Sequence, residues 1–149
     1  MRGVTGSMHM EIAAIDTVFL FVSDLPRSSD YYAKLLGREP SRSRENLLAS
    51  FEIGDTHLLL HSDANATWLP AGMKKGVGMA LHLRVKDIEA HWERLNLLEI
   101  PLPEKPTTLH TGVRKFAMKD PDGYEVEFVE PRYRQELWIG ASADHAAAS

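Results

Sequence analysis

The carboxylates near the end of the chain are the first candidates for chemistry. They follow the segment Asp120–Gly123, which predicts a tight turn because proline presets φ and glycine accepts a positive φ. Polar and apolar residues then alternate, which predicts a strand with Glu125, Glu127 and Val129 on one face. A carboxylate held at such a place could ligate a metal or act as a general base. The alternative interpretation is a solvated outer face.

Histidines on other predicted strands could join this carboxylate. The period of two in a strand gives two further sets that each share a face: His57, Leu59 and His61, and Ala80, His82 and Arg84. A neutral imidazole opposite a carboxylate in a dry cavity makes a proton-transfer pair, so His82 and Glu127 are candidates for general acid and base. The alternative is that these are hydrogen-bonded cavity histidines. We assign no role to His9, His91 or His145, and His110 is either a loop contact or a surface residue.

Other side chains could shape or charge a cavity. Lys115 could project inward to bind an anionic group, or could be solvated. Phe19 and Phe21 share a face with Thr17 and would give either an aromatic wall or plain core packing. Trp68 could cover the cavity or pack on a dimer partner. The charged segment 38–45 is most simply a solvated edge strand.

The elements that would position these residues form two similar runs. The sequence predicts helices near Leu25–Leu36 and Ile88–Leu95, the first started by Ser23 or Asp24 and ended by Gly37. The expected strands are Ile15–Val22, Leu47–Ile53, Thr56–His61, Met79–Val85, Val113–Met118 and the one after the final turn.

An internal repeat gives the organisation of the chain. Val22-Ser23-Asp24-Leu25 matches Val85-Lys86-Asp87-Ile88, so a strand runs into a helix-starting Asp in each copy. We therefore expect an α+β fold of two βαβββ modules in one domain, residues 12–131. Module one is 12–63, the linker is 64–78 and module two is 79–131, with tails at 1–11 and 140–149. The two sheets would curl toward one another around a cavity.

Composition excludes several classes of function. The 149 residues carry a net charge of −4, which gives no reason to expect nucleic acid or an anionic membrane as a partner. Cysteine is absent, so there is no thiol nucleophile, thiolate metal site or disulfide. No apolar run is long enough for a membrane span and the first ten residues lack a signal-peptide core, so we expect a cytoplasmic protein.

Two stretches carry a family resemblance. The opening, from Val18 through Leu25 to the Leu35-Leu36-Gly37 helix end, and the closing Asp120–Glu127 hairpin resemble the vicinal oxygen chelate superfamily. That group contains glyoxalases, bleomycin-resistance proteins, fosfomycin-resistance enzymes and extradiol dioxygenases. The resemblance covers residues 12–131 and implies two βαβββ modules, a curled sheet around a cavity, and a homodimer.

The resemblance also implies a divalent metal, with ligands on the first and last strand of each module. The corresponding positions here are Thr17, Leu59, Ala80 and Glu127. Of these only Glu127 is an ordinary ligand, so no cofactor is expected, although a divalent metal remains possible. A displaced facial set could draw on His57, His61, His82 and Glu127.

Two classes of function follow. The first is binding of a small, partly apolar organic molecule without the usual metal, in a cavity lined by Thr17, Phe19, His57, Leu59, His61, Ala80, His82, Lys115 and Glu127. The alternative is an enzyme: a metal-dependent lyase, isomerase or dioxygenase with displaced ligands, or a metal-free acid/base catalyst using His82 and Glu127.

Overall fold

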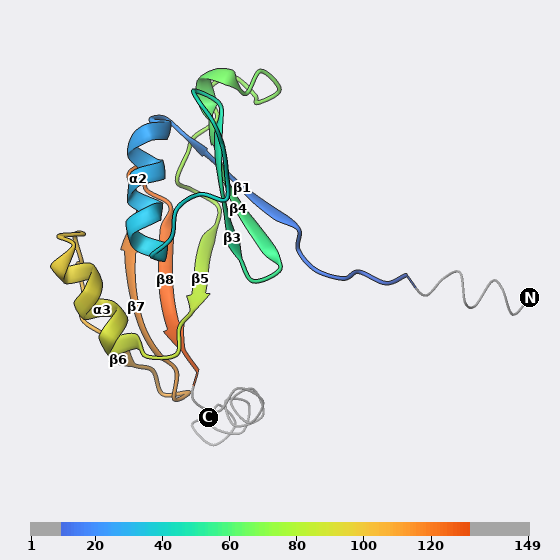
Figure 1. Ribbon diagram of the computed structural model, residues 1–149. Coiled ribbons are helices and arrows are strands. Elements are labelled where there is room, and N and C mark those ends of the chain that lie inside the picture. Colours follow the sequence, from blue (N-terminus) through green and yellow to red (C-terminus); the bar gives the residue numbers. More distant parts are fainter. Residues whose placement is uncertain (1–9, 132–149) are drawn as a thin grey trace, which may run out of the picture.

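The computed structural model describes residues 10–131, and it contains two modules with the same order of elements (Figure 1). Module one is β1 (Thr17–Val22), α2 (Leu25–Leu36), β2 (Arg42–Arg44), β3 (Leu48–Ile53) and β4 (Thr56–Ser62). Module two is β5 (Ala80–Arg84), α3 (Ile88–Leu97), β6 (Thr107–Thr108), β7 (Arg114–Lys119) and β8 (Glu125–Glu130), and the short helix η1 (Asp63–Asn65) opens the linker. The predicted βαβββ repeat is confirmed.

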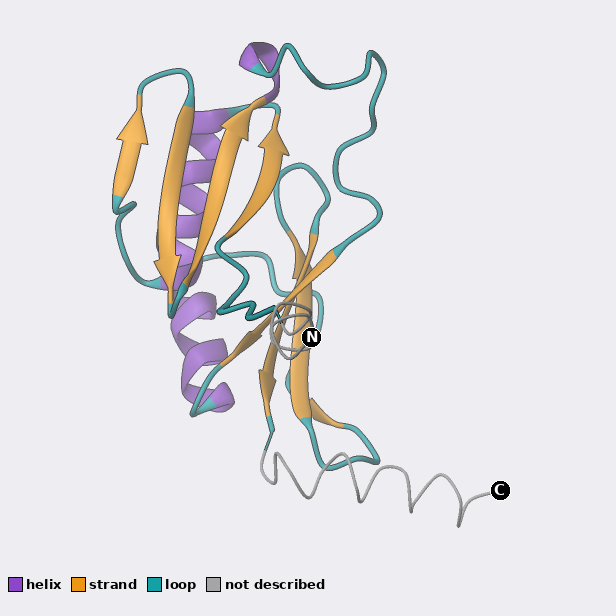
Figure 2. Ribbon diagram, turned by 90° about the vertical axis from the view of Figure 1, so that its right-hand side faces the viewer, coloured by secondary structure: helices purple, strands orange, loops and turns teal. Residues whose placement is uncertain are grey.

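Each module forms its own four-stranded sheet, in the orders β1-β4-β3-β2 and β5-β8-β7-β6. The first and last strand of each module are parallel neighbours, and the remaining pairs are antiparallel. The sheets are curled and not closed, and α2 lies behind the first sheet in the view of Figure 2. This topology places β1 beside β4 and β5 beside β8, so the candidate residues on these strands become neighbours.

The two helices begin as the sequence predicts. The Asp24 carboxylate accepts a hydrogen bond from the Arg27 amide at 3.2 Å, and the Asp87 carboxylate accepts one from Ala90 at 3.1 Å. Gly37, at φ 67°, ends α2 in the left-handed conformation that favours glycine. The repeated Asp is therefore a helix cap in both modules.

The core lies between the helices and one face of each sheet. Leu58, Leu60, Val126 and Phe128 alternate along β4 and β8, and all are buried at 2% exposure or less. Both helices lie on the same side of the sheets in Figure 1, so the opposite sheet faces have no helix over them. The residues between these core positions, including Glu127, lie on the uncovered faces, as strand parity predicts.

Several boundaries differ from the sequence prediction. β1 begins at Thr17 instead of Ile15, and α3 continues to Leu97. The Pro-rich segment after α3 contains β6, a two-residue strand too short to leave a periodic signal. Neither described helix is long and apolar enough to cross a membrane.

The buried carboxylate of Asp120 joins the two modules. Its Oδ2 accepts a hydrogen bond from the Tyr32 hydroxyl of α2 at 2.7 Å. Its Oδ1 accepts bonds from the amides of Asp122 and Tyr124, both at 2.9 Å. The turn also reaches module one through Asp122, which accepts a bond from the Ser23 hydroxyl at 2.6 Å. Burial raises the pKa of Asp120, and these hydrogen bonds oppose that rise because they favour the ionised form.

The linker crosses the same turn at Gly76. Gly76 has φ +79°, and a Cβ built there would lie 2.2 Å from the backbone oxygen of Asp122. Only glycine fits this close backbone approach without displacing the turn.

We predict that Tyr32→Phe destabilises the protein by about 1–3 kcal/mol, because it leaves one oxygen of a buried carboxylate without its donor. The loss of the hydroxyl raises the pKa of Asp120 further, so the free energy lost should be larger at pH 7 than at pH 4. Urea unfolding at the two pH values measures this. Tyr31→Phe is the matched control, since the Tyr31 hydroxyl makes only a 3.4 Å bond to the Lys119 carbonyl. An equal loss of unfolding free energy in Tyr32→Phe and Tyr31→Phe would contradict the role of the Tyr32 hydroxyl as the donor to Asp120.

We predict that Gly76→Ala lowers the melting temperature more than Gly72→Ala. Both glycines have positive φ, so both substitutions carry the backbone cost of about 1–2 kcal/mol. A Cβ at Gly72 meets open space, whereas one at Gly76 meets the backbone of the turn. The difference in melting temperature between the two variants therefore measures the cost of the clash between linker and turn. Equal melting temperatures would show that the turn can move away from the added Cβ without loss of stability.

Candidate functional site

Glu127 lies at the centre of a charged cluster on the uncovered face of the second sheet. It is the register partner of His82 on the adjacent parallel strand. The distance from His82 Nε2 to Glu127 Oε2 is 3.3 Å, and that from Lys115 Nζ to Glu127 Oε1 is 3.7 Å. The side chain of Glu127 is 16% exposed and that of His82 is 57% exposed. The carboxylate is thus held below the surface, with the imidazole between it and solvent.

Lys115 is fixed by a residue that the sequence analysis did not single out. Glu104 Oε1 lies 2.9 Å from Lys115 Nζ and accepts a hydrogen bond from the Ala117 amide at 2.6 Å. The hydrogen bond to Glu104 is the largest cause of a raised pKa for Lys115, so this lysine is a cation at neutral pH. Glu104 belongs to the irregular Pro-rich segment, where no period indicates which way a side chain points. Lys115 is therefore ion-paired, with 20% of its side chain exposed.

A pocket of about 660 Å³ opens beside this cluster. His82, Glu127 and Arg84 supply its polar groups. Its apolar lining comes from Leu83, Leu109, Val113, Val129 and Pro131 of module two and from Ile53 beside Gly54 of module one. Of these lining residues only His82 and Glu127 were predicted as site residues. The 109–113 segment lies between strands, so only the fold brings it to the pocket.

A second cluster lies on the uncovered face of the first sheet. The strand register pairs Thr17 with His57, Phe19 with Leu59 and Phe21 with His61. Phe19 is 44% exposed, and its ring centroid is 6.1 Å from that of Phe21. This confirms that the two phenylalanines share the face of Thr17, and places them on the open side instead of in the core.

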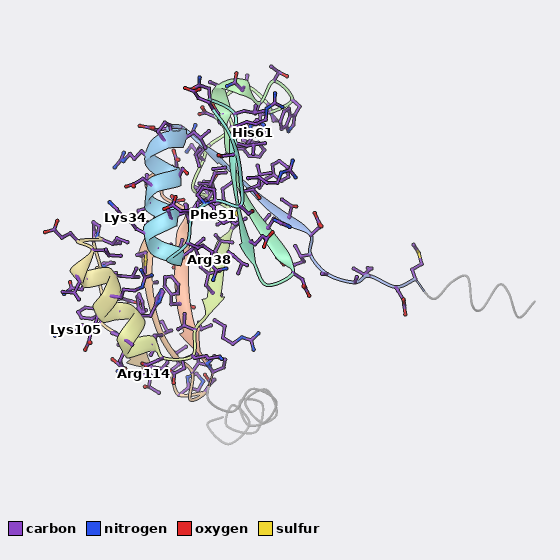
Figure 3. All side chains as sticks on the ribbon, viewed as in Figure 1. Lys34, Arg38, Phe51, His61, Lys105 and Arg114 are labelled. Carbon is purple, nitrogen blue, oxygen red and sulfur yellow. The ribbon has the colours of Figure 1, made fainter. Side chains whose placement is uncertain are left out.

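Trp68 of the linker covers one end of this aromatic cluster. Its ring centroid lies 4.9 Å from that of His61 and 6.1 Å from that of Phe21, edge-on in both cases. His61, labelled in Figure 3 near the linker end of the first sheet, is consequently buried although it lies on an uncovered sheet face. Its Nδ1 is 2.8 Å from the carbonyl oxygen of Ser62. Trp68 itself remains 61% exposed.

The two clusters lie on separate sheets, and the pocket beside Glu127 does not include the first. Within residues 10–131 of one chain, no three His, Asp or Glu side chains are placed to hold a metal ion. The set His57, His61, His82 and Glu127 is thus not assembled by a single chain.

The remaining histidines have separate surroundings. His91 lies on α3, with its ring 4.2 Å from that of Phe128, and His110 lies in the exposed loop before β7. His9 and His145 fall outside the described residues.

At the four positions where the family resemblance implies metal ligands, the donor chemistry of this chain does not fit a divalent ion. Thr17 and Ala80 occupy the first strands, Leu59 the last strand of module one, and Glu127 that of module two. A neutral hydroxyl is a poor ligand, and alanine and leucine have no donor atom. Glu127 is already engaged by two cationic or basic partners.

Comparison with known proteins identifies the family. The sequence profile of the glyoxalase/bleomycin resistance protein/dioxygenase superfamily matches residues 14–128. No curated protein matches the chain by sequence.

Solved structures show the same fold. A glyoxalase/bleomycin resistance protein/dioxygenase from Nocardioides has a TM-score of 0.71 at 22% identity, over 87% of this chain and 91% of that one. A lactoylglutathione lyase from Agrobacterium tumefaciens has 0.66 at 24%, over 80% and 95%. A glyoxalase/bleomycin resistance protein from Catenulispora acidiphila has 0.60 at 25%, over 78% and 98%. With two βαβββ modules, and a profile match over most of its length, the chain belongs to the glyoxalase/bleomycin resistance protein/dioxygenase superfamily.

Proposed function

We propose that this protein binds a small, partly apolar organic molecule at its uncovered sheet faces, without the divalent metal common in the superfamily. The observation that carries the proposal is the state of Glu127. It is the only ordinary ligand at the family's metal positions, and it is held by His82 and Lys115. One carboxylate with two such partners is a poor competitor for a divalent ion.

The surroundings of Glu127 support a ligand of mixed character. The pocket offers the carboxylate and imidazole at one side and the apolar side chains of Leu109, Val113 and Val129 at the other. Pockets of several hundred Å³ with a few polar groups among apolar ones are typical of small-molecule sites. A ligand hydroxyl or amide could donate to Glu127 while its body replaces water on the apolar wall.

The second candidate is metal-free acid/base catalysis by the same pair. The observation that favours it is the 3.3 Å separation of His82 Nε2 and Glu127 Oε2, which is close to the range for proton transfer. The carboxylate would orient the imidazole, and the exposed imidazole would exchange a proton with the ligand. A metal-dependent lyase, isomerase or dioxygenase with displaced ligands is the third hypothesis, and it requires donors beyond the groups that residues 10–131 of one chain bring together.

We also propose a homodimer. Exposed apolar side chains gather on and near the first sheet and the linker, including Phe19, Trp68, Met73 and Val77. Large aromatic residues of this kind are enriched at protein interfaces.

We predict that 2-naphthol, a fluorescent apolar ring with one hydroxyl, binds the unmodified protein and binds Glu127→Gln about tenfold more weakly. The reason is that a hydrogen bond to an ionised acceptor is stronger than one to an amide. Glu125→Gln is the matched control, since Glu125 shares the strand and the face but lies outside the pocket. Fluorescence titration measures both affinities.

Equal affinity in the wild-type protein and Glu127→Gln would contradict the proposed site. Metal analysis of protein purified without chelator tests whether the protein binds its ligand without a divalent metal. Stoichiometric nickel, zinc, manganese or iron that is lost in Glu127→Gln and in His82→Ala would contradict metal-free binding. It would support the metal-dependent enzyme with displaced ligands. Thr17→His combined with Ala80→His should raise metal affinity if these strands keep the superfamily's geometry.

We predict that the protein sediments as a dimer at micromolar concentration in analytical ultracentrifugation. In Phe19→Ser the sedimentation coefficient should shift toward that of the monomer. The change removes an exposed aromatic ring that contacts only its own cluster, so the core should be unaffected. Leu97→Ser, at an 82% exposed residue on α3, is the control. A wild-type protein of about 16.7 kDa in solution would contradict the dimer.

A further inference from the structure

A groove lies on the helix side of the molecule, where the two modules meet. Its volume is about 470 Å³. The apolar part of its lining comes from both modules: Leu35 and Leu36 of α2, Ile53 of β3, Leu83 of β5 and Phe128 of β8. Ile53, Leu83 and Arg84 also line the pocket beside Glu127, so the groove and that pocket meet at β5, with His82 and Glu127 lining only the pocket.

Cations outnumber anions around this groove. Arg38, Arg84, Lys86 and Arg94 contribute to the lining, and Asp87 is the only carboxylate among the lining residues. The Asp87 carboxylate is already engaged as the cap of α3. The groove therefore combines an apolar lining with an excess of positive charge.

Backbone carbonyls hold two of these guanidinium groups in place. Arg94 donates to the carbonyl oxygens of Lys34 and Leu35 at the end of α2, both at 3.0 Å. Arg38 donates to the carbonyl oxygen of Glu52 at 2.7 Å. Figure 3 shows Arg38 at the end of α2 that approaches module two. No carboxylate of residues 10–131 forms a salt bridge with either arginine, so their charge is positioned but not neutralised.

An imidazole completes the groove. His91 of α3 is part of its lining, and its Nε2 is buried with no hydrogen-bond partner in the described part of the chain. Burial, and then the charge of Arg94, lower the pKa of His91 to about 4, so the ring is neutral at pH 7. A buried polar atom without a partner is uncommon.

We propose that the groove between α2 and α3 binds a small amphipathic anion, a carboxylate on a medium-length apolar chain. The chain would lie on the leucine and phenylalanine side chains, and the carboxylate would face the guanidinium groups. Arginine suits this role because its planar fork of donors matches a carboxylate. Since the lining spans both modules, the ligand would also stabilise their junction. The site adjoins the one proposed around Glu127 at Ile53, Leu83 and Arg84, but its guanidinium groups Arg38 and Arg94 and its imidazole His91 line the groove alone.

Calorimetric titration of the full chain with sodium octanoate tests the proposal. We expect saturable binding at one site, about fivefold weaker in Arg38→Gln because one partly exposed cation contributes modestly in water. Ala90→Trp should abolish binding: Ala90 lies on the exposed face of α3 and lines the groove, so the indole would fill it while the core stays intact. Octanol, which has the same chain without the charge, should bind at least about tenfold more weakly.

Two controls separate this site from others. Arg42→Gln removes an exposed arginine on β2 outside the groove and should leave octanoate affinity unchanged. Octanoate should shift the ring resonances of His91 and not those of His57. The proposal is wrong if octanoate does not bind, if Ala90→Trp binds it as the wild type does, or if Glu127→Gln alone abolishes binding.

Discussion

The structure depends on one buried carboxylate. Asp120 receives three hydrogen bonds, one from the Tyr32 hydroxyl of module one and two from amides of its own turn. A buried carboxylate is costly unless it is hydrogen-bonded, so this turn is stable only where α2 presents its tyrosine. The same turn aims β8, and with it Glu127, at a fixed place beside β5. The position of the candidate site therefore follows from the docking of the two modules.

The two sides of the molecule differ, because the helices cover only one side of the sheets. Both helices pack on one side and bury the aliphatic and aromatic residues of the sheets. The opposite faces carry two clusters outside the main core. One is an aromatic cluster around Phe19 and Trp68, and the other is a charged cluster around Glu127. On the helix side a groove remains at the junction of the two modules, where Arg94 of α3 donates a hydrogen bond to the carbonyl oxygen of Leu35 in α2.

The charged cluster gives Glu127 partners from its own chain. Glu127 and Glu104 share the single cation of Lys115, at 3.7 and 2.9 Å. His82, at 57% exposure against 16% for Glu127, is the more accessible member of the His82–Glu127 pair.

The sequence alone determined the two modules, both helix caps, the closing turn and the face on which Glu127 lies, because these depend on residues a few positions apart. It also placed Phe19 and Phe21 on the face of Thr17, although periodicity could not tell an open face from a core. Only the tertiary structure decided what surrounds Glu127. Glu104, Leu109 and Val113 lie in irregular segments, where no period fixes the direction of a side chain. The groove beside His91 likewise needed the docking of two modules, since its residues come from five elements that are far apart in the chain.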